Sequence, residues 1–546
     1  MIRKSILGNE IKYDEETINL SIEEILSARF DSELDFSGNL DDLYDPYLLA
    51  DMDKRVSRIK AAYENKERVV IFGDYDVDGV TSTSILVHFF KKIGLQISYR
   101  LPHRVEDGYG LKTYFIDELL EKNVSLIITV DCGTRDIDVI KYAKEKGIDI
   151  IVTDHHAVPE IIPEEAIAII NPKRTDCSYP FKFLSGAGVA YKLMMALAKD
   201  FLSENEYKLY LQESIDIRAI GTVADCMSLT GENRIIVKEG LKQLKNSRSK
   251  GIRSIIETRI NEDLDADVFG FLIGPRLNAA GRMDTPYKAL NLILNNSDTL
   301  QDTIDEIEFL NEKRKILTKS FIEDALQKVT LTDNIIFYES LEIEHGIIGI
   351  IAGRLTENFF KPSIVLKEET DKYVASCRSP EYFDIVELLE EFKEDFLHFG
   401  GHKQAAGFSI SKEKFPNFKK NVLQKLNSLD FSKNNKILQI DKIVIPDELG
   451  FRFLETINKF KPFGMGNKKP ILMFKDFYIE KVEFLGQTRE HIKITNKYGF
   501  KIIGFGFGKY MEEIKQKKEI DLVFDLSEDN WNNKKSLKLQ IIDLVI

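Results

Sequence analysis

Short apolar stretches alternate with amphipathic stretches along residues 66–171. The apolar stretches lie in "RVVIFGD", "QISYRLP", "VSLIITVDCG", "IDIIVTDHH" and "AIAIINP". Between them, "VTSTSILVHFFKKIG", "KTYFIDELLEKN" and "RDIDVIKYAKEKG" have the spacing of amphipathic helices. This alternation predicts an α/β fold with a parallel, doubly wound sheet. Such a sheet binds ligands beyond the carboxyl ends of its strands.

The pattern changes further along the chain. Residues from about 186 to 330 are mostly helical, and 297–330 has helical periodicity without proline or glycine, which predicts a long helix connecting two domains. A second, smaller α/β pattern covers about 333–410, where "NIIFYE" and "SIVLKE" are expected strands. From about 434 onward, short apolar strands such as "FYIEKVEFL" predict a small β-barrel of the OB type.

These patterns divide the chain into five segments, and its 546 residues are enough for three or four domains. We expect an N-terminal segment, a large α/β domain, a connecting helix, a smaller α/β domain and an OB-like barrel. Their predicted limits are residues 1–44, 45–296, 297–332, 333–430 and 431–546.

Composition indicates the expected cellular location of the protein more than its function. A net charge of −13 argues by itself against nucleic-acid binding, although an acidic protein can carry a local basic groove. No apolar stretch approaches the ~20 residues that span a membrane, and the N-terminus lacks a signal-peptide core, so we expect a cytoplasmic protein. The four cysteines lack CxxC spacing, which argues against a zinc knuckle and a disulfide scaffold.

The segment "GDYDVDG" places Asp74, Asp76 and Asp78 within five positions. Such carboxylates raise one another's pKa unless a cation compensates them. An EF-hand calcium loop begins in the same way, but its twelfth position should be Glu and is Ile85 here. That loop should also follow a helix, whereas "ERVVIF" predicts a buried strand. We therefore expect the carboxylates at a strand's carboxyl end, facing other ligands.

Three other segments place similar residues where we expect strand ends. "TVDCG" contains Asp131, "VTDHH" contains Asp154, His155 and His156, and "IGTVADC" contains Asp225. Singly, an aspartate there is often a turn or cap residue, and a histidine pair is more often structural. Together they predict two divalent ions about 3.5–4 Å apart that hydrolyse a phosphoester. Mixed histidine and carboxylate ligands favour Mn²⁺, with Mg²⁺ also suitable.

The segments "DYDVDG", "TVDCG", "VTDHH" and "IGTVAD" resemble the motifs of the DHH phosphoesterase superfamily. Further segments, in the family's order, are similar to RecJ, a family of bacterial single-strand-specific 5′→3′ DNA exonucleases. They are "LPHRVEDGYGL", "LSGAGVAYKL", "GPRLNAAGRMDTP", "HGIIGIIAGRL", "SCRSP", "FGGHKQAAGFSI" and "FKPFGMGNKKP". The resemblance extends from about residue 45 to the C-terminus, so the two α/β domains resemble a DHH domain and a DHH-associated domain.

The resemblance implies roles in a site that holds two Mn²⁺ or Mg²⁺ ions. The implied metal ligands are Asp74, Asp76, Asp78, Asp131, His155 and Asp225. The implied catalytic set is Asp76, Asp78, Asp131, His155, His156 and Asp225. Within these sets, Asp74 and His156 are ligands or groups close to ligands, and His156 would contact the scissile phosphate. Asp154 would orient a histidine.

Three residues beside the implied ligands, Phe72, Cys132 and Cys226, are not expected to take part in catalysis. RecJ proteins often have a histidine where Phe72 stands, so no ligand comes from this position. We interpret Cys132 and Cys226 as small buried residues rather than catalytic thiols.

The resemblance also implies nucleic-acid contacts outside the metal site. The implied residues are Arg104, Tyr109, Arg282, Ser376, Arg378, Gly400, Gly401 and His402. Ser376 and Arg378 fit a phosphate clamp, and Tyr109 is expected to stack on a base. The glycines suit close approach of backbone to phosphate, or alternatively a tight turn under a helix. Arg276 is expected to hold its own loop, and "GAG" at 186–188 to allow close helix packing.

The implied function is metal-dependent 5′→3′ hydrolysis of single-stranded DNA to nucleoside 5′-monophosphates, in DNA repair and recombination. The barrel would offer a groove for single-stranded DNA, although its interleaved lysines and aromatics also suit a solvated strand face. The implied partners are a single-strand-binding protein and a helicase, and we expect a monomer. Because the chain ends soon after the barrel, we expect no further docking domain.

Two rival functions stay open. A DHH-type phosphodiesterase acting on short oligonucleotides or cyclic dinucleotides shares the core motifs, but is normally shorter and lacks the barrel. A non-catalytic binding protein of the same fold would have lost ligands, whereas this chain keeps every core aspartate and the DHH triplet.

Overall fold

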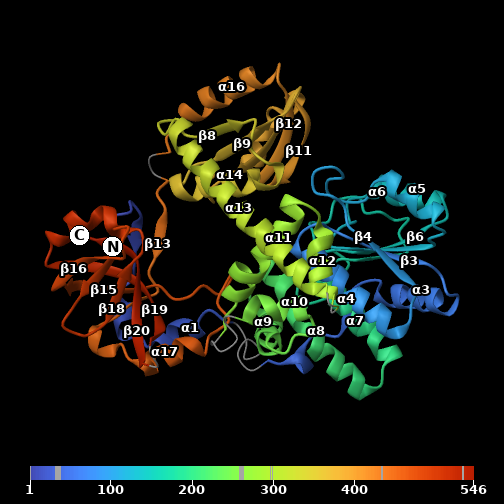
Figure 1. The fold of residues 1–546 in the computed structure, drawn as a ribbon, viewed down its shortest axis with the longest axis horizontal. Coiled ribbons are helices and arrows are strands. Elements are labelled where there is room, and N and C mark those ends of the chain that lie inside the picture. Colours follow the sequence, from blue (N-terminus) through green and yellow to red (C-terminus); the bar gives the residue numbers. More distant parts are fainter. Residues whose placement is uncertain are drawn as a thin grey trace. The chain divides into compact units, whose positions relative to one another are not determined.

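The computed structural model describes residues 2–30, 38–257, 264–295, 297, 299–431, 434–531 and 534–546. They form two compact units (Figure 1). The larger unit comprises Ser37–Leu429 and Gly464–Gly466, and the smaller unit comprises Met1–Phe36, Asp430–Phe463 and Asn467–Ile546. The limits of the five segments expected from the sequence stay a prediction. Among the described residues, no helix is both long and apolar enough to cross a membrane.

The larger unit contains the parallel sheet that the alternating pattern predicts. Its order is β4-β3-β5-β6-β7, and every neighbouring pair is parallel. The strands are β3 (Val69–Gly73), β4 (Ile97–Arg100), β5 (Leu126–Val130), β6 (Asp149–Thr153) and β7 (Ala168–Ile170). The order extends in both directions from β3, so the sheet is doubly wound and its carboxyl ends share one edge.

Helices cover both faces of this sheet because side chains alternate along each strand. Val69 and Ile71 of β3 pack with α4 and α7, whereas Val70 and Phe72 pack with α5 and α6 on the opposite face. Figure 1 shows this layering. The helices are α3 (Met52–Glu64), α4 (Val77–Ile93), α5 (Thr113–Glu121), α6 (Ile137–Glu145) and α7 (Gly186–Phe201).

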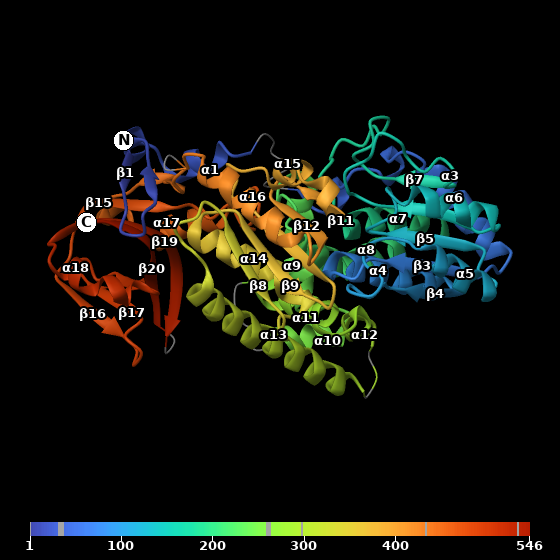
Figure 2. The same ribbon diagram turned by 90° about the horizontal axis from the view of Figure 1, so that it is seen from above.

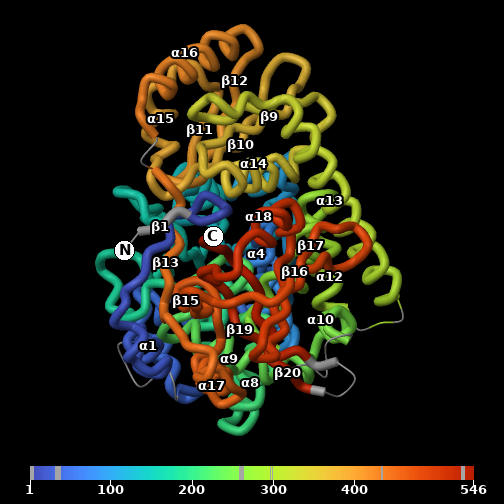
Figure 3. The backbone as a smooth tube through the Cα atoms, turned by 90° about the vertical axis from the view of Figure 1, so that its left-hand side faces the viewer, coloured from blue at the N-terminus to red at the C-terminus, as the bar shows by residue number. Residues whose placement is uncertain are grey.

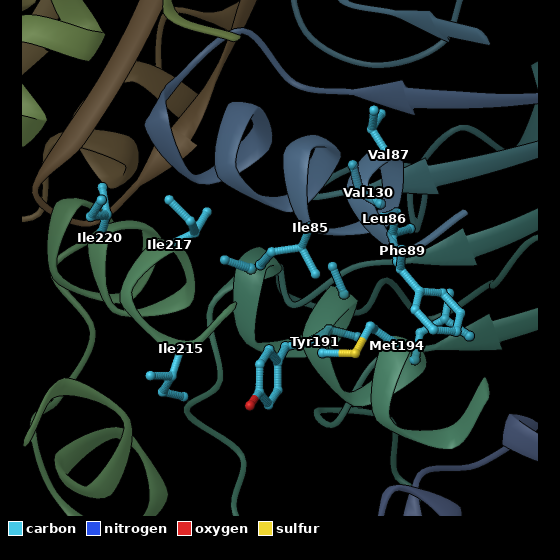
Figure 4. Packing of buried hydrophobic residues seen from close by; sticks show 14 of the residues in the cluster. Ile85, Leu86, Val87, Phe89, Val130, Tyr191, Met194, Ile215, Ile217 and Ile220 are labelled. Carbon is cyan, nitrogen blue, oxygen red and sulfur yellow. The ribbon is translucent and has the colours of Figure 1, made fainter. Parts of the chain in front are cut away.

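A helical region follows the sheet, as predicted. Ile85 and Phe89 of α4 lie beside Tyr191 and Met194 of α7, and α8 adds Ile217 to the same core (Figure 4). The helices are α8 (Glu204–Ala224), α9 (Gly231–Leu244), α10 (Lys250–Ile256), α11 (Gly274–Met283) and α12 (Pro286–Leu294). The predicted connecting helix is α13 (Leu300–Lys328), the long helix of Figure 2.

The segment before Asp225 corrects the sequence interpretation. We expected Asp225 at a strand end, but it caps the C-terminus of helix α8. Residues along this part of α8 are buried on every side of the helix. A short apolar run in a buried helix cannot be distinguished from a buried strand by periodicity alone.

The second α/β region has a five-stranded sheet in the order β11-β12-β10-β9-β8. Only the β8–β9 pair is parallel. One face packs against α14 and α13, and Phe408 and Phe418 pack together on the other. The elements are β8 (Ile336–Ser340), α14 (His345–Phe359), β9 (Ser363–Glu368), β10 (Lys372–Arg378), α15 (Ile385–Glu390), β11 (Phe396–His402), β12 (Ala405–Ser411) and α16 (Phe415–Asn427).

The smaller unit is β-rich, as predicted, and its main sheet has the order β14-β15-β19-β20-β18-β17-β16. The strands are β14 (Lys442–Ile443), β15 (Leu472–Tyr478), β16 (Lys481–Leu485), β17 (His491–Thr495), β18 (Lys501–Gly504), β19 (Glu519–Trp531) and β20 (Lys534–Val545). "FYIEKVEFL", expected to be one strand, contains the end of β15 and all of β16.

The N-terminal residues fold with the smaller unit. Strands β1 (Ile2–Lys4) and β2 (Glu10–Lys12) form a sheet with β13 (Ile437–Gln439), and β2 pairs with β13 in parallel (Figure 3). The fully buried Lys442 donates hydrogen bonds to the carbonyls of Thr17 and Leu20. Helices α1 (Ile22–Ser27), α17 (Phe451–Asn458) and α18 (Met511–Lys515) complete the unit.

Candidate metal centre and phosphate pocket

The first three carboxylates surround the junction between β3 and α4. Asp76 is the N-cap of α4, and its Oδ1 accepts hydrogen bonds from the backbone N–H groups of Asp78 (2.9 Å) and Gly79 (3.1 Å). Asp74 is buried, and within the described residues its Oδ1 has no hydrogen-bond partner. A strand-to-helix junction therefore presents carboxylates to one point, as the sequence predicts.

Asp78 is held by a second helix. Its carboxylate accepts hydrogen bonds from the N–H groups of Gly186 (2.5 Å) and Ala187 (2.9 Å), which begin α7. Unpaired N–H groups and the helix dipole both favour an anion there. A Cβ on Gly186 would lie 2.6 Å from Asp131 Oδ1. The "GAG" segment thus begins a helix that supports two predicted ligands, which the sequence analysis did not identify.

His155 lies at the convergence of the cluster. Its Nε2 is 3.1 Å from Asp131 Oδ1, 3.5 Å from Asp225 Oδ2 and 3.7 Å from Asp78 Oδ2. Of these atoms, Nε2, Asp131 Oδ1 and Asp225 Oδ2 are buried and have no hydrogen-bond partner in the part of the chain that the structure describes. Buried polar atoms rarely lack partners. A cation ligated by them would satisfy these atoms.

The electrostatics support the same conclusion. Burial, followed by repulsion between the carboxylates, raises the pKa of Asp78 to about 7 and of Asp225 to about 9, and it raises those of Asp74 and Asp131 as well. Burial lowers the pKa of His155 to about 3, so its imidazole is neutral and suited to ligate a metal. Divalent cations would relieve the repulsion.

The candidate ligands fall into overlapping groups whose atoms lie within 4.8 Å of one another. One group is Asp78, His155 and Asp225, and another is Asp74, Asp76 and Asp131. A third, Asp131, His155 and His156, joins them. Asp131 belongs to the second and third groups, and His155 to the first and third, so these two residues connect all three. Oxygen-rich ligands with one or two imidazoles suit Mn²⁺ or Mg²⁺.

Asp154 organises the two histidines rather than facing the ligand cluster. Its Oδ1 accepts from the backbone N–H groups of His155 (2.7 Å) and His156 (3.1 Å), and lies 2.8 Å from His156 Nδ1. Although burial acts in the opposite sense, contacts with His156 hold the pKa of Asp154 below its ordinary value. The Thr134 N–H and the Asn171 amide, which donates to His156 O (2.8 Å), complete this support, and the sequence analysis missed both.

Tyr109 lies beside the histidines. Its hydroxyl donates to the Asp131 carbonyl (3.2 Å) and lies 3.1 Å from His156 Nδ1. The two rings meet edge to face, with centroids 5.6 Å apart. Tyr109 therefore contacts residues of the metal centre through its hydroxyl. The sequence analysis predicted only that its ring stacks on a base.

Four of the predicted nucleic-acid contacts line one cavity of about 450 Å³. They are Arg104, Arg282, Ser376 and Arg378. A Cβ on Gly346 would lie 1.9 Å from the Arg282 carbonyl oxygen, so this glycine lets α14 pack directly on the end of α11. The Arg104 guanidinium stacks on the Tyr75 ring at 4.0 Å, and Tyr75 separates Asp74 from Asp76 in the sequence. The cavity is therefore next to the carboxylate cluster.

The cavity is mainly cationic, because three arginines and Lys372 line it together with one carboxylate, Glu369, which pairs with His345. Arg378 donates to Ser376 Oγ (3.2 Å), and Arg282 to the Gly346 carbonyl (3.1 Å). Among the described residues, no carboxylate forms an ion pair with Arg104, Arg282 or Arg378. Burial and the neighbouring Arg104 lower the pKa of Arg282 to about 9, so it is charged at neutral pH. An anion such as phosphate would bind here despite the acidic composition.

The remaining predicted residues have other surroundings. Gly400, Gly401 and His402 lie on β11, where Gly401 packs against β12 and Gly400 has open space beside it. Burial and the charges of Arg135, His156 and Lys173 lower the pKa of His402. Arg276, expected to hold its own loop, instead lies on helix α11, where it binds Glu308 of α13 and the Leu272 carbonyl.

Two predictions beside the ligands have different outcomes. Phe72 is fully buried and packs against Phe115, in agreement with its exclusion as a ligand. Cys132 is buried as expected, but Cys226 is exposed, which corrects its interpretation as a buried residue. Cys226 has a positive φ of 55° in the turn after α8, which directs the side chain outward.

A carboxylate–histidine cluster at the carboxyl edge of a doubly wound sheet, connected by a long helix to a second α/β domain, defines a phosphoesterase of the DHH class. Residues 68–222 match the DHH family N-terminal domain, 332–428 the DHHA1 domain and 440–543 the RecJ OB domain. The chain is 30% identical to the single-stranded-DNA-specific exonuclease RecJ of Haemophilus influenzae, over 92% of each chain. The chain therefore belongs to the RecJ family.

A second RecJ sequence and a RecJ crystal structure are also similar to this chain. The chain is 33% identical to the single-stranded-DNA-specific exonuclease RecJ of Bacillus subtilis over 92% of its own length, and it spans 64% of that relative. The fold matches the crystal structure of RecJ in complex with Mn²⁺ from Thermus thermophilus with a TM-score of 0.84 and 26% identity, covering 98% of this chain and 80% of that chain. The predicted fold class is confirmed, while the individual residue roles stay predictions.

Proposed function

We propose that this chain is a metal-dependent exonuclease that hydrolyses single-stranded DNA from its 5′ end and releases nucleoside 5′-monophosphates. One observation carries the proposal: a buried carboxylate–histidine cluster lies next to a cavity lined by three arginines that lack carboxylate partners among the described residues. The cluster suits cations and the cavity suits an anion. This pairing fits a substrate whose terminal phosphate is held while the adjacent phosphodiester is cleaved.

In this proposal, Asp74, Asp76, Asp78, Asp131, His155 and Asp225 hold two Mn²⁺ or Mg²⁺ ions. Two bound ions supply an activated water and neutralise charge on the phosphoryl group. His156 hydrogen-bonds a scissile phosphate oxygen, and Asp154 and Tyr109 fix its ring. Fixing the ring removes a rotation that would otherwise be lost on substrate binding.

Arg104, Arg282, Ser376 and Arg378 bind the terminal 5′ phosphate. A guanidinium binds phosphate through two parallel hydrogen bonds. Holding the terminal phosphate in this cavity would fix which phosphodiester bond lies at the metal centre. His402, Gly400 and Gly401 approach the DNA from the second domain, and the OB unit binds the following strand. We propose a cytoplasmic monomer acting in DNA repair and recombination, with a single-strand-binding protein and a helicase as partners.

The test uses single-stranded DNA labelled at either end, with Mn²⁺, a duplex control and an Asp131→Ala variant. We expect immediate release of labelled mononucleotide from the 5′-labelled strand alone, no release from duplex and none from the variant. Turnover of dinucleotides without cleavage of long strands would instead indicate a small phosphodiesterase. Binding without cleavage under both metals would indicate a non-catalytic protein.

A further inference from the structure

Three residues of the "FKPFGMGNKKP" segment have no role in the function proposed above. Gly464–Gly466 belongs to the larger unit, although the chain on both sides of it belongs to the smaller unit. The N–H group of Leu229 donates a hydrogen bond to the Met465 carbonyl at 2.7 Å. Leu229 is buried, whereas the Met465 side chain is exposed. The segment therefore contacts the loop between α8 and α9 through its backbone.

Both glycines of the segment closely approach the loop. Gly466 has a positive φ of 75°, and a Cβ there would lie 2.1 Å from Ser228 Oγ. A Cβ on Gly464 would lie 2.6 Å from Leu229 Cδ1. Larger residues would separate the segment from the loop.

The loop between α8 and α9 begins at Asp225, a predicted metal ligand. Asp225 ends α8, and Ser228 and Leu229 follow three and four positions later. On its inner side, the Asn233 amide donates to the Ser228 carbonyl at 3.0 Å. On its other side the loop contacts Gly464–Gly466. The backbone after Asp225 is thus held between two fixed groups.

The Asp225 side chain is less enclosed than those of Asp78 and Asp131. Its side chain is 26% exposed, against 1% for Asp78 and 3% for Asp131. Asp78 is fixed by two N–H groups of α7, whereas Asp225 Oδ2, like Asp131 Oδ1, has no hydrogen-bond partner among the described residues. On its N-terminal side Asp225 is held by α8, because its backbone N–H donates to the Gly221 carbonyl at 3.0 Å. On its C-terminal side, its position follows from the loop.

We infer that Gly464–Gly466 is a positioning element for the metal centre, which fixes the loop after Asp225 and so places this carboxylate on the metal. The inference rests on the metal site proposed above. Groups that orient metal ligands without touching the metal typically change metal affinity by about 10- to 100-fold when altered. Gly464–Gly466 would therefore tune the metal centre of the larger unit, to which this segment belongs.

The test compares Gly466→Ala with Gly486→Ala in the full chain. Gly486 also has a positive φ, of 83°, but a Cβ there meets no atom within 4 Å, so it matches the backbone strain without the clash. We expect Gly466→Ala to raise the Mn²⁺ concentration for half-maximal rate, and the Mn²⁺ dissociation constant from calorimetry, by about tenfold. Gly486→Ala should leave both close to wild type.

A compensating change sharpens the test. Ser228→Gly removes the side chain that the new Cβ would meet, so Ser228→Gly/Gly466→Ala should recover most of the Mn²⁺ affinity relative to Ser228→Gly alone. The inference is overturned if Gly466→Ala lowers the unfolding midpoint but leaves Mn²⁺ affinity unchanged. If Gly466→Ala does not fold, Gly464→Ala, which faces only the movable end of Leu229, decides by the same Mn²⁺ measurement.

Asp225→Ala distinguishes failure of the proposed metal site from failure of the positioning role of Gly464–Gly466. If this variant binds Mn²⁺ as tightly as wild type, the proposed metal site is wrong. If Asp225→Ala loses affinity while Gly466→Ala and Gly464→Ala do not, the metal site stands and only the positioning inference fails.

Discussion

The metal centre and the phosphate cavity lie next to each other but use opposite charges and different construction. The centre collects carboxylates where strands β3 and β5 end, and backbone N–H groups of α4 and α7 hold two of them. The cavity collects guanidinium groups from separate elements, including α11 and β10. Sheet topology therefore assembles the first site, whereas packing between two domains assembles the second.

Both sites concentrate like charge, and this has a common consequence. The carboxylates raise one another's pKa values, and Arg104 lowers that of Arg282. Each cluster is therefore destabilising without its ligand, because repulsion between like charges is relieved only by a counter-ion. Ligand binding at either site should stabilise the fold as well as support the reaction.

The largest expected effect comes from the centre. Asp131→Ala removes a carboxylate that belongs to two of the three ligand groups. It should lower the rate by at least about a thousandfold, since metal contacts contribute several kcal/mol to the barrier. The assay is mononucleotide release under Mn²⁺. Asp216→Asn is the matched control, because Asp216 is also buried and has a pKa raised by burial, to about 6, but lies outside the cluster. Equal losses in both variants would show that the centre has no special role.

The cavity should respond in a substrate-dependent way. Arg378→Ala should lower kcat/KM on 5′-phosphorylated single strands by about 10- to 100-fold, because a hydrogen bond to a charged group contributes ~1.5–3 kcal/mol. Strands with a 5′-hydroxyl should be nearly unaffected. Arg276→Ala is the control, since Arg276 pairs with Glu308 instead of lining the cavity. An equal loss on both substrates would contradict the phosphate role.

The same contrast explains what the sequence could predict. Asp74, Asp76, Asp131 and the histidine pair follow apolar strands, so local pattern alone brings them to one sheet edge. Asp225 was expected at a strand end, because a buried helix and a buried strand look alike over a few residues. The α7 donors to Asp78 were missed because the nearer one is 108 residues away in sequence.

The cavity was accessible only through the family resemblance. Arg282 and Arg378 come together because Gly346 lets α14 pack on the Arg282 carbonyl, and no periodicity encodes that contact. The N-terminal strands posed the same problem, since β2 pairs with β13 from the far end of the chain.

Metal addition should stabilise the fold through the centre alone. At a tenfold excess over its dissociation constant, Mn²⁺ should raise the free energy of unfolding by about 1.4 kcal/mol. Thermal unfolding with and without a chelator measures this difference. Arg378→Ala should retain the stabilisation and Asp131→Ala should lose it. If both variants retained it, the metal would bind elsewhere.

We expect the smallest effect from removing the hydroxyl of Tyr109, which lies at the edge of the metal centre. Tyr109→Phe keeps the ring but removes the hydroxyl that bonds to the Asp131 carbonyl and faces His156. One such hydrogen bond contributes ~0.5–1.5 kcal/mol, so kcat should fall by about 2- to 10-fold with KM unchanged. If the ring mainly stacks on a base, Tyr109→Phe should behave as wild type, and only Tyr109→Ala should raise KM. Because the two roles affect different kinetic constants, this pair of variants distinguishes a residue of the metal centre from a residue of the DNA path.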